Sequence, residues 1–391
     1  MPANPYPEIQ DPRSAPPASG GPMVLHVRCV SGRGGGPEKT ILRSPEHLER
    51  LGYRGIAAYL FDAGDEGFQE LLDWAEREKC PLIGVPDGGA LDRTLIAKFV
   101  YLCERYDVKI WHGHDYKSNL LGILVRKRLG RPLTMVSTAH GWVHKTWKTP
   151  LYFGIDRWCL RRYEHVIAVS GDLFSACKKA RVPVPRLTLI HNAIESDVFR
   201  PDERTAQSKA QRERLVIGGV GRLAHEKGFD HLIRAVCTLR DEGHDIALEI
   251  AGEGPEQADL QAQIDASGHA QFLTLLGHQS DKHALYSRFD IYVLSSLREG
   301  LPNVILEALA MELPMVATRC GGVVEAVGDG VEALLCDSGS DAELLAPLRR
   351  LVTDSALRQI LAKQGRARIE KDFDFAARMQ RMTAIYDSLL A

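Results

Sequence analysis

The sequence has no apolar run long enough to cross a membrane, no closely paired cysteines and no large excess of charge of one sign. A membrane-spanning helix needs roughly 18 or more consecutive apolar residues, so we expect none. Residues 1–22 also lack the basic and apolar regions of a signal peptide. Their proline, serine and glycine content predicts a flexible tail.

The eight cysteines form no CxxC pair, which argues against a zinc site and fits a reducing compartment. We therefore expect a cytoplasmic protein. The 49 basic and 51 acidic residues nearly balance. A nucleic-acid-binding protein usually carries a clear basic excess, so we expect no nucleic-acid partner.

The charge is unevenly distributed along the chain. Residues 1–200 hold 28 basic and 22 acidic side chains, which leaves 21 basic and 29 acidic ones for the remainder. A basic first half can attract phosphates or the anionic inner face of a membrane, where the protein would bind peripherally. The alternative is an ordinary solvated surface.

Short apolar runs alternate with amphipathic segments over nearly the whole chain, which predicts an α/β fold with parallel sheets. The first apolar run is MVLHVRCV, from residue 23. The expected helices lie at residues 38–51, 67–79, 91–106, 118–129, 151–162, 229–240, 255–266, 303–311 and 342–352.

A polar stretch at residues 195–214 interrupts this alternation and indicates a linker. We expect a Pro-rich tail (1–22), a first α/β domain (23–200), a second α/β domain (201–372) and a final helix (373–391) that packs back toward the first domain. Tandem α/β domains favour a ligand cleft between them, lined by the carboxyl ends of the strands.

Two junctions between a strand and a helix have the character of phosphate sites. In SGRGGGPEKT, Gly35 and Gly36 allow close backbone approach at a helix N-terminus, although a flexible turn is the alternative and no dinucleotide or P-loop pattern is present. In GVGRLAHEKG, Gly221 leads into a loop where Arg222 offers a bidentate fork and Lys227 a mobile charge, which suits a diphosphate.

Two further junctions carry acids and histidines. In LREGLPNVILEA, Glu299 and Glu307 flank a turn, with Asn303 a candidate N-cap, and two carboxylates can hold sugar hydroxyls. His140 ends a strand in STAHGW. In WHGHDYKSN, the histidines resemble metal ligands, but their spacing predicts no metal site; acceptor binding and structural roles stay open. The acceptor candidates are His114, Asp115, Lys117 and Asn192.

The ordered motifs GGGPEKT, TAHGW, VIAVS, HNAI, GRLAHEKG, AGEGPE, LGH and EGLPNVILEA resemble the retaining GT-B glycosyltransferases of glycosyltransferase family 4. The resemblance covers nearly everything from residue 23 onward, and the paired glutamates are its most specific element. It implies two Rossmann-like domains facing across a cleft. It also implies sugar transfer from a nucleotide sugar, with UDP favoured over GDP and no metal or other cofactor.

The resemblance implies roles for single residues. Arg222 and Lys227 would hold the donor diphosphate, Glu307 the ribose and Glu299 the donor sugar. The backbone at His278 would contact the base, beside Glu253. His140 would lie near the donor sugar, and the first glycine loop near phosphate and acceptor. The turn expected to contact the sugar and phosphate comprises Gly300, Leu301, Pro302 and Asn303.

The resemblance further implies front-face attack by the acceptor rather than a covalent intermediate. The sequence departs from the family in GGGPEKT and HGHDYKSN, which leaves the acceptor in doubt. A lipid-linked or polysaccharide acceptor leads, and a small soluble acceptor is the alternative. A nucleotide-sugar epimerase or phosphorylase on the same fold and a non-catalytic subunit remain as other hypotheses, although no cofactor lysine for a pyridoxal-dependent phosphorylase can be placed.

Overall fold

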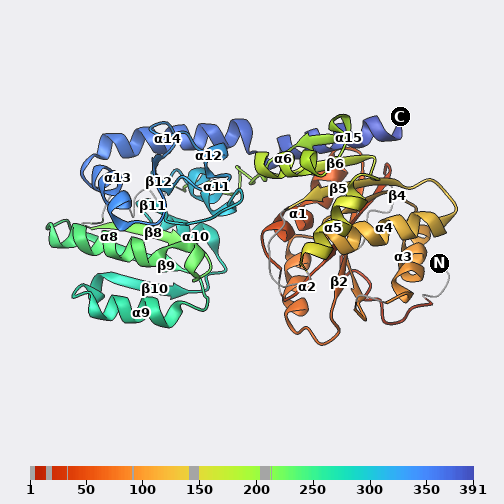
Figure 1. The fold of residues 1–391 in the computed structure, drawn as a ribbon, viewed down its shortest axis with the longest axis horizontal. Coiled ribbons are helices and arrows are strands. Elements are labelled where there is room, and N and C mark those ends of the chain that lie inside the picture. Colours follow the sequence, from red (N-terminus) through yellow and green to blue (C-terminus); the bar gives the residue numbers. More distant parts are fainter. Residues whose placement is uncertain are drawn as a thin grey trace. The chain divides into compact units, whose positions relative to one another are not determined.

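The computed structural model describes residues 5–14, 20–32, 34–89, 92–140, 149–202, 212 and 214–391, with the backbone alone for 149–151. The chain divides into two compact units (Figure 1). Unit 1 comprises Met1–His191 and Ala376–Ala391, and unit 2 comprises Asn192–Phe375.

Unit 1 is built on a seven-stranded parallel sheet of order β3-β2-β1-β4-β5-β6-β7. Its strands are β1 Met23–Cys29, β2 Arg54–Phe61, β3 Leu82–Pro86, β4 Val108–Gly113, β5 Thr134–Ala139, β6 His165–Ala168 and β7 Leu187–Leu189. Its helices are α1 Gly36–Arg50, α2 Gly67–Arg77, α3 Thr94–Arg105, α4 Tyr116–Leu129, α5 Thr149–Leu160, α6 Gly171–Lys179 and α15 Phe375–Leu390, with a 3-10 turn η1 Val184–Arg186.

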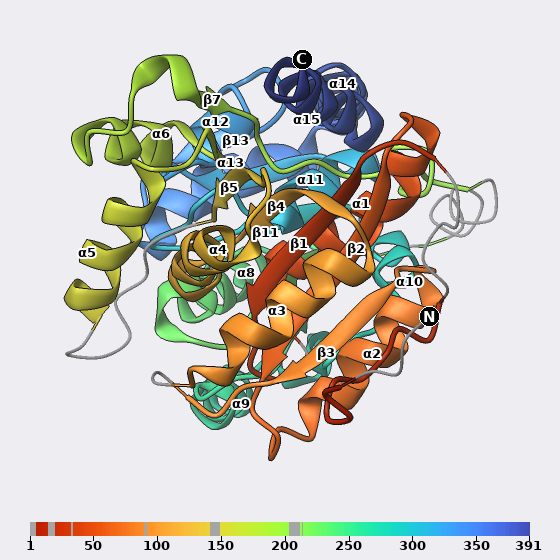
Figure 2. The same ribbon diagram turned by 90° about the vertical axis from the view of Figure 1, so that its right-hand side faces the viewer.

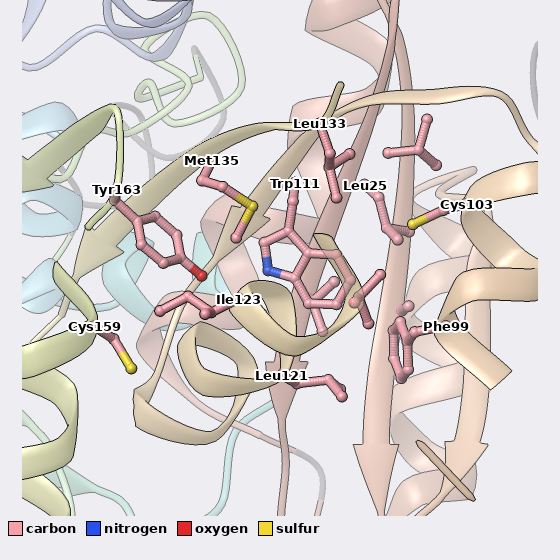
Figure 3. Close-up of a cluster of buried hydrophobic side chains, with 14 of the residues drawn as sticks. Leu25, Phe99, Cys103, Trp111, Leu121, Ile123, Leu133, Met135, Cys159 and Tyr163 are labelled. Atoms are coloured by element: carbon pink, nitrogen blue, oxygen red, sulfur yellow. The ribbon is translucent and has the colours of Figure 1, made fainter. Parts of the chain in front are cut away.

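Apolar side chains from both the sheet and the helices pack around Trp111 of β4, which is fully buried (Figure 3). The ring of Phe99 on α3 lies 5.4 Å from the Trp111 ring, centroid to centroid. A Cβ on Gly122 of α4 would come within 2.5 Å of the indole nitrogen, so glycine lets α4 pack closely on the sheet. Figure 2 shows α3 in front of β1.

Unit 2 has a six-stranded parallel sheet of order β10-β9-β8-β11-β12-β13. Its strands are β8 Leu215–Val220, β9 Ile246–Ala251, β10 Leu273–Gly277, β11 Ile291–Leu294, β12 Met315–Thr318 and β13 Leu334–Cys336. Its helical segments are η2 His225–Lys227, α8 Phe229–Asp241, α9 Gln257–Ala266, η3 Ala270–Phe272, α10 Lys282–Ser287, α11 Asn303–Ala310, α12 Val323–Ala326, α13 Asp341–Thr353 and α14 Ser355–Asp372.

The prediction of an α/β fold with two parallel sheets is confirmed. In each sheet the first strand, β1 or β8, lies centrally. The next two strands extend to one side of it, and the fourth strand, β4 or β11, pairs on its other side, as in Rossmann-like domains. Within the part of the chain that the structure describes, no helix is long and apolar enough to cross a membrane.

The prediction of a flexible tail over residues 1–22 is wrong for residues 5–14. Gln10 exchanges two backbone hydrogen bonds with Gly84 of β3, with N–O distances of 2.8 and 3.0 Å, and Ile9 is buried. The Lys98 ammonium lies 3.1 Å from the carboxylate of Glu8. This segment therefore covers the edge of the first sheet, which its proline-rich composition did not reveal.

Along the chain, the boundary between the two units falls between His191 and Asn192, not between residues 200 and 201 as the sequence suggested. The reason is local pairing, because the Ile194 N–H donates to the carbonyl of Phe373 over 2.9 Å and the Phe375 N–H returns to Ile194 over 3.0 Å. The start of the polar stretch is thus part of unit 2.

Candidate active site

In unit 2, backbone hydrogen bonds connect the loops that follow three neighbouring strands. The Gly221 N–H donates to Ala251 (3.0 Å), and the Gly252 N–H donates to Gly277 (2.9 Å). A Cβ on Gly252 would lie 1.8 Å from the Gly221 oxygen, so only glycine allows this approach. The carboxyl ends of β8, β9 and β10 are therefore held at one edge.

Three residues expected to bind the nucleotide lie on these loops. The Leu223 N–H donates to the Glu253 carbonyl over 2.9 Å, which places Arg222 and Glu253 on adjacent backbone segments. The side chains of Arg222, Glu253 and His278 are all exposed. Among the described residues none pairs with the Arg222 guanidinium, so its fork is available to an anion.

Lys227 is brought to the end of β11 by a tight turn. Gly228 adopts a left-handed conformation (φ 60°), and a Cβ there would lie 2.4 Å from the Ser295 carbonyl oxygen. The Ser295 hydroxyl donates to the Lys227 carbonyl over 2.9 Å. Glycine at this position thus allows η2 to approach β11.

Lys227 and Glu299 form an ion pair in the structure. Their Nζ–Oε1 distance is 2.6 Å, and the Ser296 hydroxyl donates to the same oxygen over 2.7 Å. The Lys227 side chain is 20% exposed and that of Glu299 10%, so the contact is largely shielded from water. An ammonium has three protons and a carboxylate two oxygens, so each group retains capacity for a ligand.

The turn after Glu299 is fixed by two glycines of the following junction. A Cβ on Gly321 would lie 1.8 Å from the Glu299 carbonyl oxygen, and the Gly322 N–H donates to Gly300 over 2.9 Å. Asn303 is not the N-cap that the sequence suggested. Pro302 occupies the cap of α11 with extended backbone, and Asn303 is the first helical residue, because the chain turns directly at the proline.

Glu307 is buried, with 2% of its surface exposed, and accepts a hydrogen bond from the Tyr286 hydroxyl over 2.8 Å. Burial and the neighbouring carboxylate of Glu307 raise the pKa of Tyr286 well above its usual range. Tyr286 therefore remains a donor at all physiological pH values, and it orients the carboxylate.

Unit 1 brings four histidines together: His26 lies within β1 and His112 within β4, while His114 and His140 directly follow the ends of β4 and β5. His26 Nδ1 lies 3.0 Å from His114 Nε2, and His114 Nδ1 lies 3.0 Å from His140 Nε2. His112 contacts the Tyr386 hydroxyl through Nδ1 (2.6 Å) and Thr138 through Nε2 (2.7 Å). The expected residues His114 and His140 thus meet directly.

Burial lowers the pKa of every histidine in this cluster. It brings the pKa of His26 to about 3, assisted by the positive charge of Arg378. The pKa values of His112 and His114 fall well below the usual range, chiefly through burial and then through other histidines. For His140, burial is followed by the charge of Arg28. All four are neutral at physiological pH.

The histidine cluster is poorly arranged for a metal ion. Nitrogen atoms of His26, His112 and His114 lie within 4.8 Å of one another, close enough to suggest ligands. However, the His112 and His114 rings are stacked 4.5 Å apart with 9° between their planes. An imidazole lone pair lies in its ring plane, so one ion cannot lie in both planes.

Asp115 and Lys117, which were expected to bind the acceptor, have structural partners. Asp115 caps α4 by accepting from the backbone N–H of Lys117 and Ser118, and it also accepts from Cys29 N–H over 2.7 Å. Lys117 binds the carboxylate of Asp87 at 2.6 Å. Asp115 makes its capping contacts because it occupies an N-cap position, which HGHDYKSN also allows.

The first glycine loop is occupied by a side chain of the protein itself. The Gly35 N–H, expected near phosphate, donates to Glu38 over 2.6 Å, and Glu38 also pairs with Arg28 at 2.5 Å. Gly36 begins α1. Asn192 lies at the unit boundary, and no described residue makes a hydrogen bond to its side chain.

Sequence reasoning missed four residues that shape these sites: His26, Glu38, Tyr286 and Ser296. A polar residue inside an apolar strand was the available signal for His26, in MVLHVRCV. Glu38 lies within the recognised motif GGGPEKT, and Ser296 directly precedes LREGLPNVILEA. Nothing local marked Tyr286, because its contact with Glu307 joins residues of two different helices.

Comparisons with known proteins agree for both halves of the chain. Residues 34–198 match the model of Glycosyltransferase Family 4, and residues 201–368 match that of Glycosyl transferases group 1. One relative is the capsular polysaccharide biosynthesis glycosyltransferase CapM of Staphylococcus aureus. The two sequences are 27% identical over a match that covers 76% of this chain and 82% of CapM.

A second relative is the 2-deoxystreptamine glucosyltransferase of Streptomyces kanamyceticus, 29% identical over 57% of this chain; the match spans 60% of that enzyme. Among solved structures, Anabaena HepE in complex with UDP has a TM-score of 0.80 at 22% identity. The superposition covers 94% of this chain and 100% of the HepE chain. This likeness shows a shared fold.

Proposed function

The chain belongs to glycosyltransferase family 4, with its second half in glycosyl transferases group 1, and from this membership we propose its reaction. It transfers a sugar from a UDP-sugar to a lipid-linked or polysaccharide acceptor, with retention of configuration. The observation that carries the proposal is the shielded contact of Lys227 with Glu299, 2.6 Å long, at the end of β11.

The diphosphate of the donor binds Arg222 and Lys227. Arg222 supplies a planar fork and Lys227 the two ammonium protons that the ion pair leaves over. The N-terminus of α11, next to Pro302, adds backbone N–H groups and the positive end of a helix dipole. These groups suit two phosphates bearing adjacent negative charges.

The remaining donor contacts follow the same edge of unit 2. Glu307, oriented by Tyr286, accepts from the ribose hydroxyls, and Glu299 accepts from a hydroxyl of the sugar. The backbone at His278 and the loop of Glu253 border the base. HepE, which shares the fold, has been crystallised with UDP and with UDP-glucose, which supports uracil over guanine.

The proposed chemistry is front-face substitution at the anomeric carbon. The bond from that carbon to the leaving phosphate oxygen breaks, a bond to the acceptor oxygen forms on the same face, and the acceptor proton passes to the phosphate. A covalent route is less suitable, because Glu299 already accepts two hydrogen bonds on Oε1 from Lys227 and Ser296, which lower its nucleophilicity.

Charge that develops on the leaving diphosphate is stabilised by the two cations, a task that a metal ion performs in other transferases. We therefore propose turnover without a bound metal. Turnover should persist in EDTA, and a requirement for added Mg²⁺ or Mn²⁺ would overturn this part of the proposal.

The acceptor assignment rests on relatives and on charge. CapM is named for capsular polysaccharide biosynthesis, and residues 101–200 hold 17 basic and 8 acidic side chains. If this surface binds a lipid-linked acceptor at a membrane, the protein should sediment with anionic vesicles, less so as salt rises. Equal recovery with neutral vesicles would argue against it.

A small soluble acceptor is the second candidate. The observation that favours it is the 29% identity to 2-deoxystreptamine glucosyltransferase, whose name gives a small acceptor. Transfer to soluble amino alcohols in the absence of vesicles distinguishes this function from the first. An epimerase would convert the nucleotide sugar without any acceptor.

Donor binding is tested first by thermal unfolding, followed by circular dichroism, with UDP, GDP, ADP and CMP. A ligand at 100 times its Kd stabilises by about 2.7 kcal/mol, which is readily measured. We expect UDP to stabilise the wild type and not Lys227→Ala. Lys363→Ala removes an exposed lysine of α14 and serves as the matched control. An equal UDP shift in Lys227→Ala would overturn the diphosphate assignment.

A further inference from the structure

A chain of contacts joins three imidazoles across three neighbouring strands of unit 1. His26 lies on β1, where it is paired in register with His112 of β4, while His114 and His140 follow the ends of β4 and β5. The two N–N distances along the chain His26–His114–His140 are both 3.0 Å. The nitrogen at the inner end, His26 Nε2, is buried and has no partner among the described residues.

We propose that this chain holds His140 in the tautomer with its proton on Nδ1, so that His140 offers a hydrogen bond to its ligand and does not act as a base. His26 and His114 are then positioning residues. The identity of the ligand, an oxygen of the sugar or phosphate, rests on the proposed function. The tautomer does not.

A neutral imidazole has one N–H and one lone pair, so each N–N contact needs one donor and one acceptor. Burial keeps all three rings neutral, as the lowered pKa values indicate. The protons along the chain must therefore all be ordered in one direction. Either every ring carries its proton on Nδ1, or every ring carries it on Nε2.

The inner end of the chain decides between these two orders. With the protons on Nε2, His26 would bury an N–H that has no described acceptor. With the protons on Nδ1, only a lone pair is left unsatisfied there. Buried N–H groups without a partner are rarer in proteins than buried acceptors without one. The arrangement with every proton on Nδ1 is therefore the more stable one.

This order has a direct consequence at the outer end. His140 Nε2 accepts from His114, and its remaining group is the Nδ1–H. His140 is only partly buried, and no described residue makes a hydrogen bond to its Nδ1. The charge of Arg28 helps to keep the ring neutral. A neutral N–H donor suits a hydroxyl or phosphate oxygen and cannot accept the proton of an attacking hydroxyl.

The tautomer can be read directly by long-range ¹H–¹⁵N correlation spectra of protein with ¹⁵N-labelled histidine. The chain has 14 histidines, so the signals are assigned with single variants. We expect protonated Nδ1 and unprotonated Nε2 for His26, His114 and His140. A protonated Nε2 on His114 or His140 would overturn the proposal, whether or not the protein transfers sugar.

A pair of variants at His26 tests the positioning role. Asparagine places an amide N–H near the former Nδ1 and keeps the donor to His114, whereas leucine removes it. We expect His26→Leu to lower kcat about tenfold or more, as is typical for loss of an orienting partner, and to mix the tautomers of His140. His26→Asn should retain both kcat and the His140 Nδ1–H signal.

Two results separate this inference from the proposed function. Stabilisation by UDP depends on unit 2 and should be unchanged in both His26 variants. If the wild type did not bind UDP, that result would contradict the proposed donor site and leave the tautomer proposal untouched. An equal loss of kcat in His26→Asn and His26→Leu, with an unaltered His140 signal, would show a merely structural role and overturn the positioning assignment.

Discussion

At the scale of single residues, Glu299 contacts Lys227 of the proposed phosphate site and, in the proposed function, also a hydroxyl of the sugar. Its Oε1 accepts from both Lys227 and Ser296. Replacing Glu299 therefore has two opposite effects. It removes a contact to the sugar, and it releases the Lys227 ammonium from its ion pair.

We expect Glu299→Ala to lower kcat on the order of 10²-fold or more, because it removes an interaction made at the reacting centre. Affinity for free UDP should be retained or rise, since Lys227 gains freedom to bind phosphate. Steady-state kinetics and calorimetric titration with UDP measure the two effects. A collapse of UDP binding would show that Glu299 holds the nucleotide and not the sugar.

Tyr286 offers a second test at this scale, because its hydroxyl orients the carboxylate of Glu307 over 2.8 Å. A hydrogen bond to a charged group contributes about 1.5–3 kcal/mol. Tyr286→Phe should weaken UDP binding roughly tenfold by loosening Glu307, and affect the binding of inorganic pyrophosphate much less. Titration with both ligands measures the difference, and equal losses would contradict a ribose role for Glu307.

At the scale of elements, close contacts between loop backbones hold the strand ends of unit 2 in place. Gly252 has φ 148°, and a Cβ there would lie 1.8 Å from the Gly221 carbonyl oxygen. Backbone cannot move aside as a flexible side chain does. This contact connects β8 to β9 next to Arg222.

Gly252→Ala should lower the free energy of unfolding of unit 2 by more than about 1 kcal/mol, because it combines strain with a backbone clash. Gly154→Ala is the control, since Gly154 lies within α5 with nothing within 4 Å of its Cβ. That change should stabilise the protein by about 0.5–1 kcal/mol. Urea unfolding followed by circular dichroism compares them, and equal effects would contradict the close-contact argument.

The sequence did not predict the long helix α14, nor the shorter helices α6, α10 and α12. The buried residues of α14 are only Leu361, Gly365 and Ile369, so its apolar face is narrow. It packs by a glycine, whose Cβ would lie 2.6 Å from Leu309, and by Arg366, which donates to the Ala310 carbonyl over 2.9 Å. Such contacts have no periodic signal along the sequence.

At the scale of the whole molecule, the chain forms unit 1, crosses to unit 2 and returns to complete unit 1 with α15. The Tyr386 hydroxyl of α15 lies 2.6 Å from His112 Nδ1, and Tyr53 donates to Asp387 over 2.6 Å. Residues at the end of the chain therefore support the histidine cluster. All five tryptophans lie between residues 74 and 158, so their fluorescence reports the unfolding of unit 1 alone.

The buried histidines predict that unit 1 is unstable in acid. The pKa of His26 is about 3 in the folded protein against 6.5 ordinarily, so the unfolded chain binds the proton first as pH falls. The pKa values of His112, His114 and His140 are shifted in the same direction. The charged groups facing the cluster, Arg378 and Arg28, are both cations and oppose its protonation.

The four histidines should therefore contribute no pH dependence above about pH 7.5, whereas stability should fall below pH 6.5, by up to about 1.4 kcal/mol per pH unit for each histidine. Urea unfolding followed by tryptophan fluorescence at a series of pH values measures this slope. His26→Asn should reduce it, and His225→Asn, which removes an exposed histidine of unit 2, should leave it unchanged. A slope unaffected by His26→Asn would mean that His26 is not buried in neutral form.

The sequence by itself determined the fold class, both sheets and the family, because period, turn residues and motif order are local properties of the chain. It also indicated Arg222, Lys227, Glu299 and Glu307, which lie at junctions between strands and helices. It did not reveal that Lys227 pairs with Glu299, since 72 positions separate them and either charge alone is compatible with free exposure.

Only the tertiary structure revealed which polar residues form hydrogen bonds or ion pairs with distant parts of the protein. Asp115 and Lys117 have the residue types of a binding site, yet one caps α4 and the other pairs with Asp87. His26 lies inside an apolar strand, yet it meets His114 from 88 positions away. Hydrogen bonds over such separations depend on strand order and burial, which no local pattern encodes.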